Sequence, residues 1–125
     1  MARIRDIVFD CTDAPALARF WAAALDGYAI RPYDDAEVAR LAERGLTPET
    51  DPQVAVDGPG PTLWFQQVAE KKTARNRVHL DLVGGERAAE VARLGELGAT
   101  VRDEHDGFTV MLDPEGNEFC VLDPA

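Results

Sequence analysis

Asp6-Ile7-Val8-Phe9, near the start of the chain, aligns without gaps with His79-Leu80-Asp81-Leu82 in its second half. Both stretches lie in β-branched or apolar sequence of alternating polarity, which predicts a strand with one face toward a core. A helical pattern follows each of them, and the two helices end at related sequences, Leu25-Asp26-Gly27 and Leu97-Gly98-Ala99. This internal similarity indicates that the fold is built from a duplicated unit.

The first half combines four expected strands with two expected helices. Apolar residues recur every three or four positions in the first helix, where Phe20 and Trp21 are assigned to packing. The segment Thr47–Pro61 is rich in Pro, Gly and Asp and is expected to be mostly loop. The strands are predicted over Ile4–Cys11, Tyr28–Pro32, Val54–Val56 and Thr62–Val68, and the helices over Ala14–Leu25 and Asp34–Arg44.

The segment Ala69–Asn76 carries several cations and no apolar residue larger than alanine, so it is interpreted as the link between modules 1–70 and 77–125. In the second half we expect strands over Arg77–Val83, Thr100–Arg102, Phe108–Leu112 and Glu118–Leu122, and a helix over Glu86–Leu97. The turn Asp113–Gly116 is expected to join the last two strands, with its acidic side chains in solvent. Because each such module leaves one sheet face uncovered, two are expected to form a single α+β domain over residues 1–125.

Charge and composition limit the kinds of molecule that the protein is expected to bind. The formal net charge is -10 in 125 residues, which disfavours nucleic acid and anionic membrane surfaces. No apolar run approaches the ~20 residues of a membrane-spanning helix, and no signal-peptide pattern opens the sequence, so a cytoplasmic location is expected. Cys11 and Cys120 do not make a disulfide framework and are predicted to be reduced thiols.

Three segments together resemble the glyoxalase/bleomycin resistance/dioxygenase superfamily, also called the vicinal oxygen chelate (VOC) superfamily, in its actinobacterial glyoxalase-like branch. They are Phe20-Trp21-Ala22-Ala23-Ala24-Leu25, Arg77-Val78-His79-Leu80-Asp81-Leu82 and Asp113-Pro114-Glu115-Gly116-Asn117-Glu118-Phe119-Cys120. The resemblance implies two βαβββ modules that form a curved open barrel around a ligand-sized cavity. It also implies a second subunit that completes or flanks the barrel, and exposed sheet edges independently favour a homodimer.

Metal-using relatives place four side chains inside the barrel, and the resemblance carries these positions to four residues of this chain. Only His79 is a usual ligand type, because acidic, amide and thiol side chains replace the usual residues elsewhere. Such a mixed set is acceptable to zinc, yet it contains a single histidine, and the sequence therefore favours a metal-poor or metal-independent cavity. The candidate ligands are Asp6, His79, Cys120 and Gln66, or else Trp64 in place of Gln66.

Strand alternation gives an independent indication of the cavity. Ile7, Phe9 and Cys11 share the face expected under a helix, which leaves Asp6 and Asp10 on the other face. In the second copy Val78, Leu80 and Leu82 are the expected apolar face, so His79 and Asp81 are predicted to face the cavity. A His beside a carboxylate in a cleft is typical of proton transfer, and equally of a structural hydrogen-bonded pair.

Four further residues are candidate ligand contacts. Trp64 and Gln66 share one strand face, and Phe108 is a second candidate wall for a planar ligand. Cys120 is either a nucleophile or a small core residue, and the core interpretation is favoured because burial raises a thiol pKa.

Two functions follow from these residues. One is an enzyme of lyase, isomerase or dioxygenase type that acts on a small carbonyl or aromatic compound, with His79 and Asp81 in proton transfer. The alternative is a protein that sequesters an antibiotic or another small molecule without chemistry, as resistance proteins of this fold do.

Overall fold

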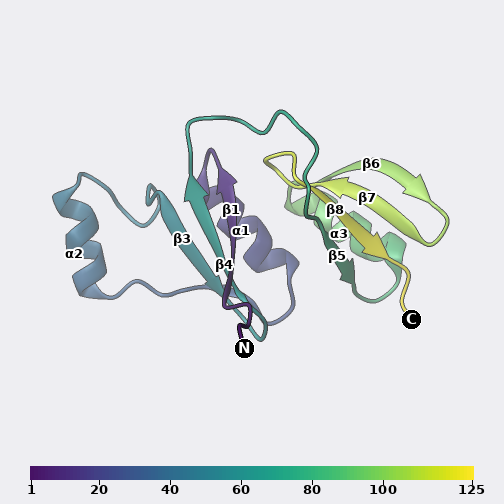
Figure 1. Ribbon diagram of the computed structural model, residues 1–125, viewed down its shortest axis with the longest axis horizontal. Coiled ribbons are helices and arrows are strands. Elements are labelled where there is room, and N and C mark those ends of the chain that lie inside the picture. Colours follow the sequence, from purple (N-terminus) through teal and green to yellow (C-terminus); the bar gives the residue numbers. More distant parts are fainter. The chain divides into compact units, whose positions relative to one another are not determined.

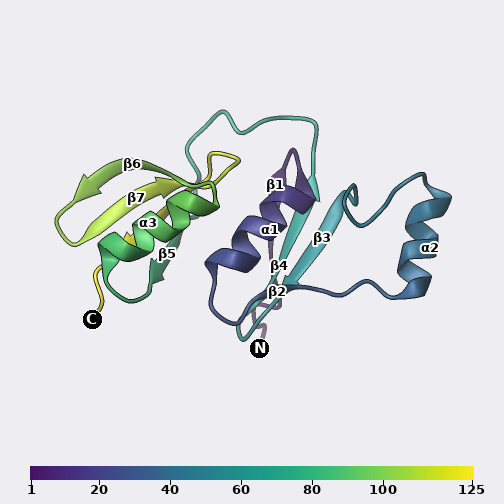
Figure 2. The same ribbon diagram turned by 180° about the vertical axis from the view of Figure 1, so that it is seen from behind.

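A computed structural model describes the whole chain, residues 1–125, and the chain divides into two compact units, Met1–Lys71 and Lys72–Ala125. Each unit is a four-stranded sheet with a helix packed on one face (Figure 1, Figure 2). The division falls inside the segment 69–76. None of the helices is both long and apolar enough to span a bilayer.

Sheet A belongs to the first unit and has the strand order β1-β4-β3-β2. β1 and β4 run parallel, whereas β3 pairs antiparallel with both β4 and β2. The elements in chain order are β1 (Asp6–Cys11), α1 (Ala14–Ala24), β2 (Ala29–Ile30), α2 (Asp35–Glu43), β3 (Gln53–Asp57) and β4 (Thr62–Gln67).

Helix α1 forms where the sequence provides both a cap and an apolar stripe. The Asp13 carboxylate accepts a hydrogen bond from the Ala16 N–H at 3.1 Å, which satisfies one of the free donors of the first turn. Leu17, Phe20 and Trp21 are at most 4% exposed, because they pack against the covered face of sheet A. This arrangement leaves the other face of the sheet uncovered by α1.

Sheet B belongs to the second unit and repeats this architecture with the order β5-β8-β7-β6. β5 and β8 are parallel, and the other two pairs are antiparallel. The elements are β5 (Leu80–Val83), α3 (Arg87–Leu97), β6 (Thr100–His105), β7 (Phe108–Leu112) and β8 (Glu118–Leu122). The α+β class and the two βαβββ modules are therefore confirmed, with α2 as an addition to the first.

The core of the second unit lies between α3 and sheet B. Leu94, Met111, Phe119 and Val121 are at most 1% exposed. Since Phe119 and Val121 alternate with Glu118, Cys120 and Leu122 along β8, the latter three face away from α3. The packing of this helix thus decides which side chains remain available on the opposite face.

Several predicted strand limits are wrong. β1 begins at Asp6, and Ile4 is 74% exposed. β5 begins only at Leu80, so Val78 is not part of an apolar strand face and is 77% exposed. Before β5 the chain is held to β8 by a side chain, because the Asn76 N–H donates to the Glu118 carboxylate at 2.8 Å. β2 is limited to two residues and ends before Pro32, which has no N–H to donate.

The turn after β7 is correctly predicted, but its first acidic side chain is not in solvent. Asp113 is 4% exposed, and its carboxylate accepts hydrogen bonds from the N–H groups of Glu115 and Asn117 at 2.9 Å. Gly116 has φ +85°, a conformation that favours glycine. Asp113 is buried because it organises the turn from inside, as aspartates do in turns that bond their own backbone.

Candidate functional site

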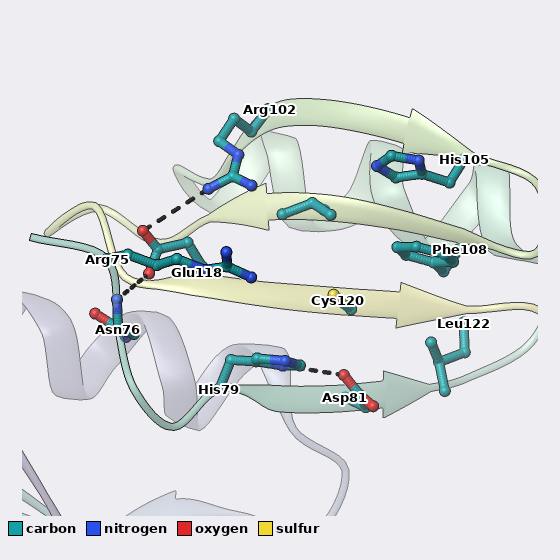
Figure 3. Close-up of a pocket in the computed structure, with 11 residues that line it drawn as sticks. Arg75, Asn76, His79, Asp81, Arg102, His105, Phe108, Glu118, Cys120 and Leu122 are labelled. Carbon is teal, nitrogen blue, oxygen red and sulfur yellow. Dashed lines mark hydrogen bonds and ion pairs between the residues drawn. The ribbon is translucent and has the colours of Figure 1, made fainter.

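The face of sheet B opposite α3 is hollowed by a cavity of about 440 Å³. This volume lies within the range of small-molecule sites in proteins. All of the lining residues belong to the second unit, and Figure 3 shows them above the strands. They are Arg75, Asn76, His79, Asp81, Arg102, His105, Phe108, Val110, Glu118, Cys120 and Leu122.

Strand register explains why most of these residues share one face. Cys120 lies opposite Val110 on one side and opposite Asp81 on the other, and Leu122 lies opposite Phe108. Directly paired residues of neighbouring strands point to the same face of a sheet. The floor of the cavity is therefore formed by β8, with walls from β5 and β7.

A β-bulge in β6 adds two polar residues to this face. The pairing of β6 with β7 shifts between Val101 and Asp103, which leaves Arg102 as the extra residue. Strict alternation would direct Arg102 and His105 to opposite faces, because three positions separate them. With the bulge, His105 pairs with Phe108, and both Arg102 and His105 line the cavity.

His79 and Asp81 are in direct contact on the wall of the cavity. The Nδ1 atom of His79 lies 3.2 Å from a carboxylate oxygen of Asp81, and the two side chains are 46% and 51% exposed. Figure 3 shows the pair at the start of β5, beside Cys120. A carboxylate at Nδ1 orients the ring and leaves Nε2 available to exchange a proton with a ligand.

Cys120 lies beside this pair as a protonated thiol. Burial raises the pKa of the Cys120 thiol, and the Asp81 carboxylate raises it further, whereas Arg102 acts in the opposite direction. The ligand atoms of His79, Asp81 and Cys120 all lie within 4.8 Å of one another. Because a thiol with a raised pKa is a poor nucleophile at neutral pH, Cys120 is better suited to packing or weak S–H donation.

Glu118 anchors the other end of the cavity. Its carboxylate lies 2.8 Å from the Lys72 ammonium, accepts the Asn76 N–H at 2.8 Å and is 3.8 Å from Arg102. Burial acts to raise the pKa of Glu118, but Lys72 and the backbone hydrogen bonds outweigh it and lower this pKa to about 2. The carboxylate is thus ionised and fixes the segment that carries Arg75.

The remaining wall is aromatic. The rings of His105 and Phe108 are stacked, with centroids 4.6 Å apart and planes 18° from parallel. Figure 3 places both rings at the end of the cavity away from Glu118. Arg75 lines the cavity and forms no ion pair.

The four predicted residues of the first unit lie on sheet A, on the face away from α1. Asp10 accepts a hydrogen bond from the Gln66 amide at 3.1 Å, and Asp6 pairs with Arg5 at 2.8 Å. Trp64 lies under the Arg31 guanidinium, 5.2 Å from its ring centre. Asp6, Asp10, Trp64 and Gln66 thus have partners within their own unit, whereas His79, Asp81, Phe108 and Cys120 meet at the cavity of sheet B.

Three side chains of this cavity carry groups that bind metal ions. Imidazole, carboxylate and thiol groups from His79, Asp81 and Cys120 suit zinc in kind. Asp81 is absent from the predicted ligand set. By register, Trp64 lies opposite Val8 as Cys120 lies opposite Asp81, so Trp64, and not Gln66, is the counterpart of Cys120. An indole is not a metal ligand, and only the three residues of sheet B would hold an ion.

Sequence reasoning missed seven lining residues. Two of them are apolar, Val110 and Leu122, and five are polar: Arg75, Asn76, Arg102, His105 and Glu118. Arg75 and Asn76 lie in the segment interpreted as a link, and the bulge that places Arg102 and His105 has no signature in the alternation. For Glu118 a signal did exist, because it shares the β8 face with Cys120 two residues later.

Comparison with known proteins shows the family and the fold. The family model described as "Glyoxalase-like domain" matches residues 6–122. A search of curated protein sequences gave no significant match. Similar solved structures include the fosfomycin resistance protein FosX from Mesorhizobium loti, with 15% identity, coverage of 100% of this chain and 94% of that chain, and a TM-score of 0.69.

Two other similar structures carry family-level names. A glyoxalase/bleomycin resistance protein/dioxygenase family enzyme from Burkholderia phytofirmans PsJN has 17% identity, coverage of 96% and 97%, and a TM-score of 0.62. A glyoxalase/bleomycin resistance protein from Albidiferax ferrireducens T118 has 17% identity, coverage of 99% and 100%, and a TM-score of 0.59. At these identities the structures establish the fold alone, and the family match extends over nearly the whole chain. The chain belongs to the glyoxalase-like domain family.

Proposed function

We propose that the cavity of sheet B binds a small carbonyl or aromatic compound and that the His79–Asp81 pair transfers a proton on it, as in an isomerase or lyase. The observation that carries this proposal is the 3.2 Å contact between His79 Nδ1 and Asp81 on the wall of a ligand-sized cavity. Both side chains are about half exposed, so a ligand in the cavity can reach the pair.

The proposed step is removal of a proton from a carbon next to a carbonyl group. Nε2 of His79 accepts the proton, and the Asp81 carboxylate stabilises the imidazolium that forms. The electron pair of the broken C–H bond moves toward the carbonyl oxygen and gives an enolate. Return of the proton to a different atom of the ligand completes an isomerisation, and no oxidant or reductant is consumed.

The proposed base and its neighbours are also the candidate metal ligands of this cavity. His79, Asp81 and Cys120 are the residues that would hold a divalent ion, which would supply Lewis-acid polarisation of a carbonyl. In the proposed step Nδ1 of His79 is engaged with Asp81, so the residues themselves provide the base. We therefore expect proton exchange to persist after dialysis against a chelator, and loss of exchange would reassign these three residues as metal ligands.

The proposal is tested by NMR in deuterated buffer with a panel of ketones and aldehydes. Wild-type protein is expected to exchange the α-protons of its ligand for deuterium, and the variants His79→Ala and Asp81→Asn are expected to slow this exchange by about 100-fold and about 10-fold. Asp106→Asn is the matched control, since it removes a carboxylate from the turn after β6 that does not line this cavity. Unchanged exchange in His79→Ala would refute the proposal.

A second candidate is sequestration without chemistry, and the stacked His105–Phe108 wall favours it because flat rings bind planar ligands by shape alone. A similar structure is named a fosfomycin resistance protein. Under this candidate, a ligand raises the melting temperature in wild type and in His79→Ala alike, with no proton exchange in either.

Two broader proposals accompany these functions. The two free cysteines suit the reducing cytoplasm, where we place the protein. We also propose that the chain works as a homodimer, because β6 ends sheet B as an exposed edge strand. Light scattering after gel filtration tests this assembly, and a monomeric mass at micromolar concentration would refute it.

A further inference from the structure

We infer that the ligand of the sheet B cavity is a planar aromatic anion, with its ring against His105 and Phe108 and its anionic group at Arg75 and Arg102. The inference rests on the proposed function in one respect, namely that a ligand occupies this cavity. It adds a ligand class that the glyoxalase-like fold does not itself specify.

The end of the cavity near Glu118, here called the cationic end, carries more positive than negative charge. Lys72, Arg75 and Arg102 gather there, whereas the carboxylates are those of Glu118 and Asp103. Glu118 is already bonded to Lys72, and Asp103 lies 2.9 Å from Arg102. One positive charge therefore remains, on Arg75, in a chain whose net charge is -10. A local cation in an acidic protein attracts an anion to that place.

Arg75 and Arg102 are also the side chains best suited to bind an anion directly. A guanidinium offers several N–H donors in one plane and binds a carboxylate or phosphonate through two parallel hydrogen bonds. Arg102 reaches the cavity only because of the bulge between Val101 and Asp103. Arg75 has no partner within the protein, and its segment is fixed nearby by the Asn76–Glu118 hydrogen bond. The donors of Arg75 are thus free for a ligand, and Arg102 offers the N–H groups that Asp103 does not take.

The aromatic end lies at a distance that suits such a ligand. Glu118 and Leu122 mark the two ends of β8, and four residues of strand span about 13 Å. Figure 3 shows Arg75 and Arg102 near Glu118, and the two rings near Leu122. The two guanidinium groups extend over part of this distance. The space that remains between them and the two rings fits a fused or substituted ring with its anionic group at one end. The His79–Asp81 pair lies along the side of this gap, where it faces the middle of the ligand.

The test uses four matched probes: 2-naphthoate, 2-naphthylphosphonate, the neutral amide 2-naphthamide, and the saturated decahydronaphthalene-2-carboxylate. Binding to the intact chain is measured by isothermal titration calorimetry at low and moderate salt. We expect the better of the two aromatic anions to bind about tenfold or more tightly than the amide and than the saturated acid. Comparing the carboxylate with the phosphonate identifies the anionic group.

Variants locate the two ends of the ligand. Arg75→Gln is expected to weaken the binding of the aromatic anion by about tenfold, because a charge-assisted hydrogen bond is lost. The affinity for the amide is expected to stay unchanged. Phe108→Leu is expected to weaken the binding of both the aromatic anion and the amide. Arg77→Gln is the matched control, since Arg77 is exposed and does not line the cavity. Thermal unfolding of each variant verifies that it is folded.

The outcomes separate this inference from the proposed function. Equal binding of amide and anions, equal binding of the saturated acid, or no binding of any probe at millimolar concentration would overturn the inference. Proton exchange on neutral carbonyl compounds would at the same time leave the proposed function standing. In contrast, tight binding of the aromatic anion, weakened by Arg75→Gln, supports the inference even where no carbonyl compound exchanges its protons.

Discussion

Replacing Glu118 with glutamine tests whether one carboxylate holds the segment after Lys72 against sheet B. Glu118 is 13% exposed, its Lys72 partner is 22% exposed, and the two charged groups are 2.8 Å apart. Glutamine keeps an acceptor for the Asn76 N–H but removes the attraction to Lys72 and to Arg102. The variant therefore isolates the contribution of the charge.

The expected cost follows from the pKa of Glu118, which falls from an ordinary value of 4.5 to about 2. Each unit of pKa corresponds to about 1.4 kcal/mol, so the full difference corresponds to roughly 3 kcal/mol. Both side chains retain some exposure, and water screens part of this attraction. We therefore expect Glu118→Gln to lower the free energy of unfolding by about 2 kcal/mol at pH 7.

The pH dependence has a definite sign. Because the pKa of Glu118 is lower in the folded than in the unfolded chain, its stabilisation is complete above about pH 4.5 and disappears as the pH falls toward 2. The difference in stability between wild type and variant is thus expected to shrink across that window. The control variant is Glu96→Gln, which removes a carboxylate from an exposed position on α3.

Urea unfolding followed by circular dichroism measures the stability, since both tryptophans lie in the first unit and the second unit contains none. The NMR shift of the Glu118 carboxyl carbon measures its pKa directly. A carboxyl that titrates near 4.5, or a variant as stable as wild type at pH 7, would refute the reasoning.

Three further expectations concern packing, backbone strain and thiol reactivity in the second unit. Met111→Ala should lower the free energy of unfolding by about 3 kcal/mol in a urea titration, because Met111 is 0% exposed, and a loss under about 1 kcal/mol would be inconsistent with its burial. Gly98→Ala should destabilise the protein by about 1 kcal/mol or more, since Gly98 has φ +121°. Gly95→Ala inside α3 should stabilise it, because the added methyl group meets nothing within 4 Å and alanine favours a helix. Melting temperatures that change in the same direction for the two variants would contradict this. Cys120 should react slowly with iodoacetamide at pH 7 and faster only in more alkaline buffer than an ordinary thiol needs, because burial raises its thiol pKa. Mass spectrometry with Cys120→Ser as control measures this, and rapid labelling at pH 7 would be the contrary result.

The fold was predictable because its signals are local. The alternation in β7 and β8 gave both strands with the limits that the structure has, and the Pro and Gly residues between them gave the turn. The placement of His79 and Asp81 on one side of the chain followed from their spacing of two residues, and the structure pairs them at 3.2 Å. Each of these inferences needs only neighbouring residues.

The remainder of the candidate site depends on interactions between distant residues. Glu118 fixes Asn76 and Lys72 across the gap between the linking segment and β8, which no periodicity encodes. The bulge at Arg102 depends on how β6 pairs with β7, and alternation alone would assign His105 to the wrong face. Asp113 was expected in solvent because acidic turn residues usually are, yet here it bonds the turn from within.

The two sheets differ at equivalent positions of their strand register. At equivalent positions of register, sheet A has Val8 opposite Trp64, and sheet B has Asp81 opposite Cys120. The indole is large and lies under Arg31, which Asp57 holds through two hydrogen bonds of 2.8 and 2.9 Å. In sheet B, the small thiol leaves room above β8, and the polar groups around it stand at the edge of that room. The smaller side chain at this register position therefore explains why the cavity lies beside His79 and Asp81 in the second unit.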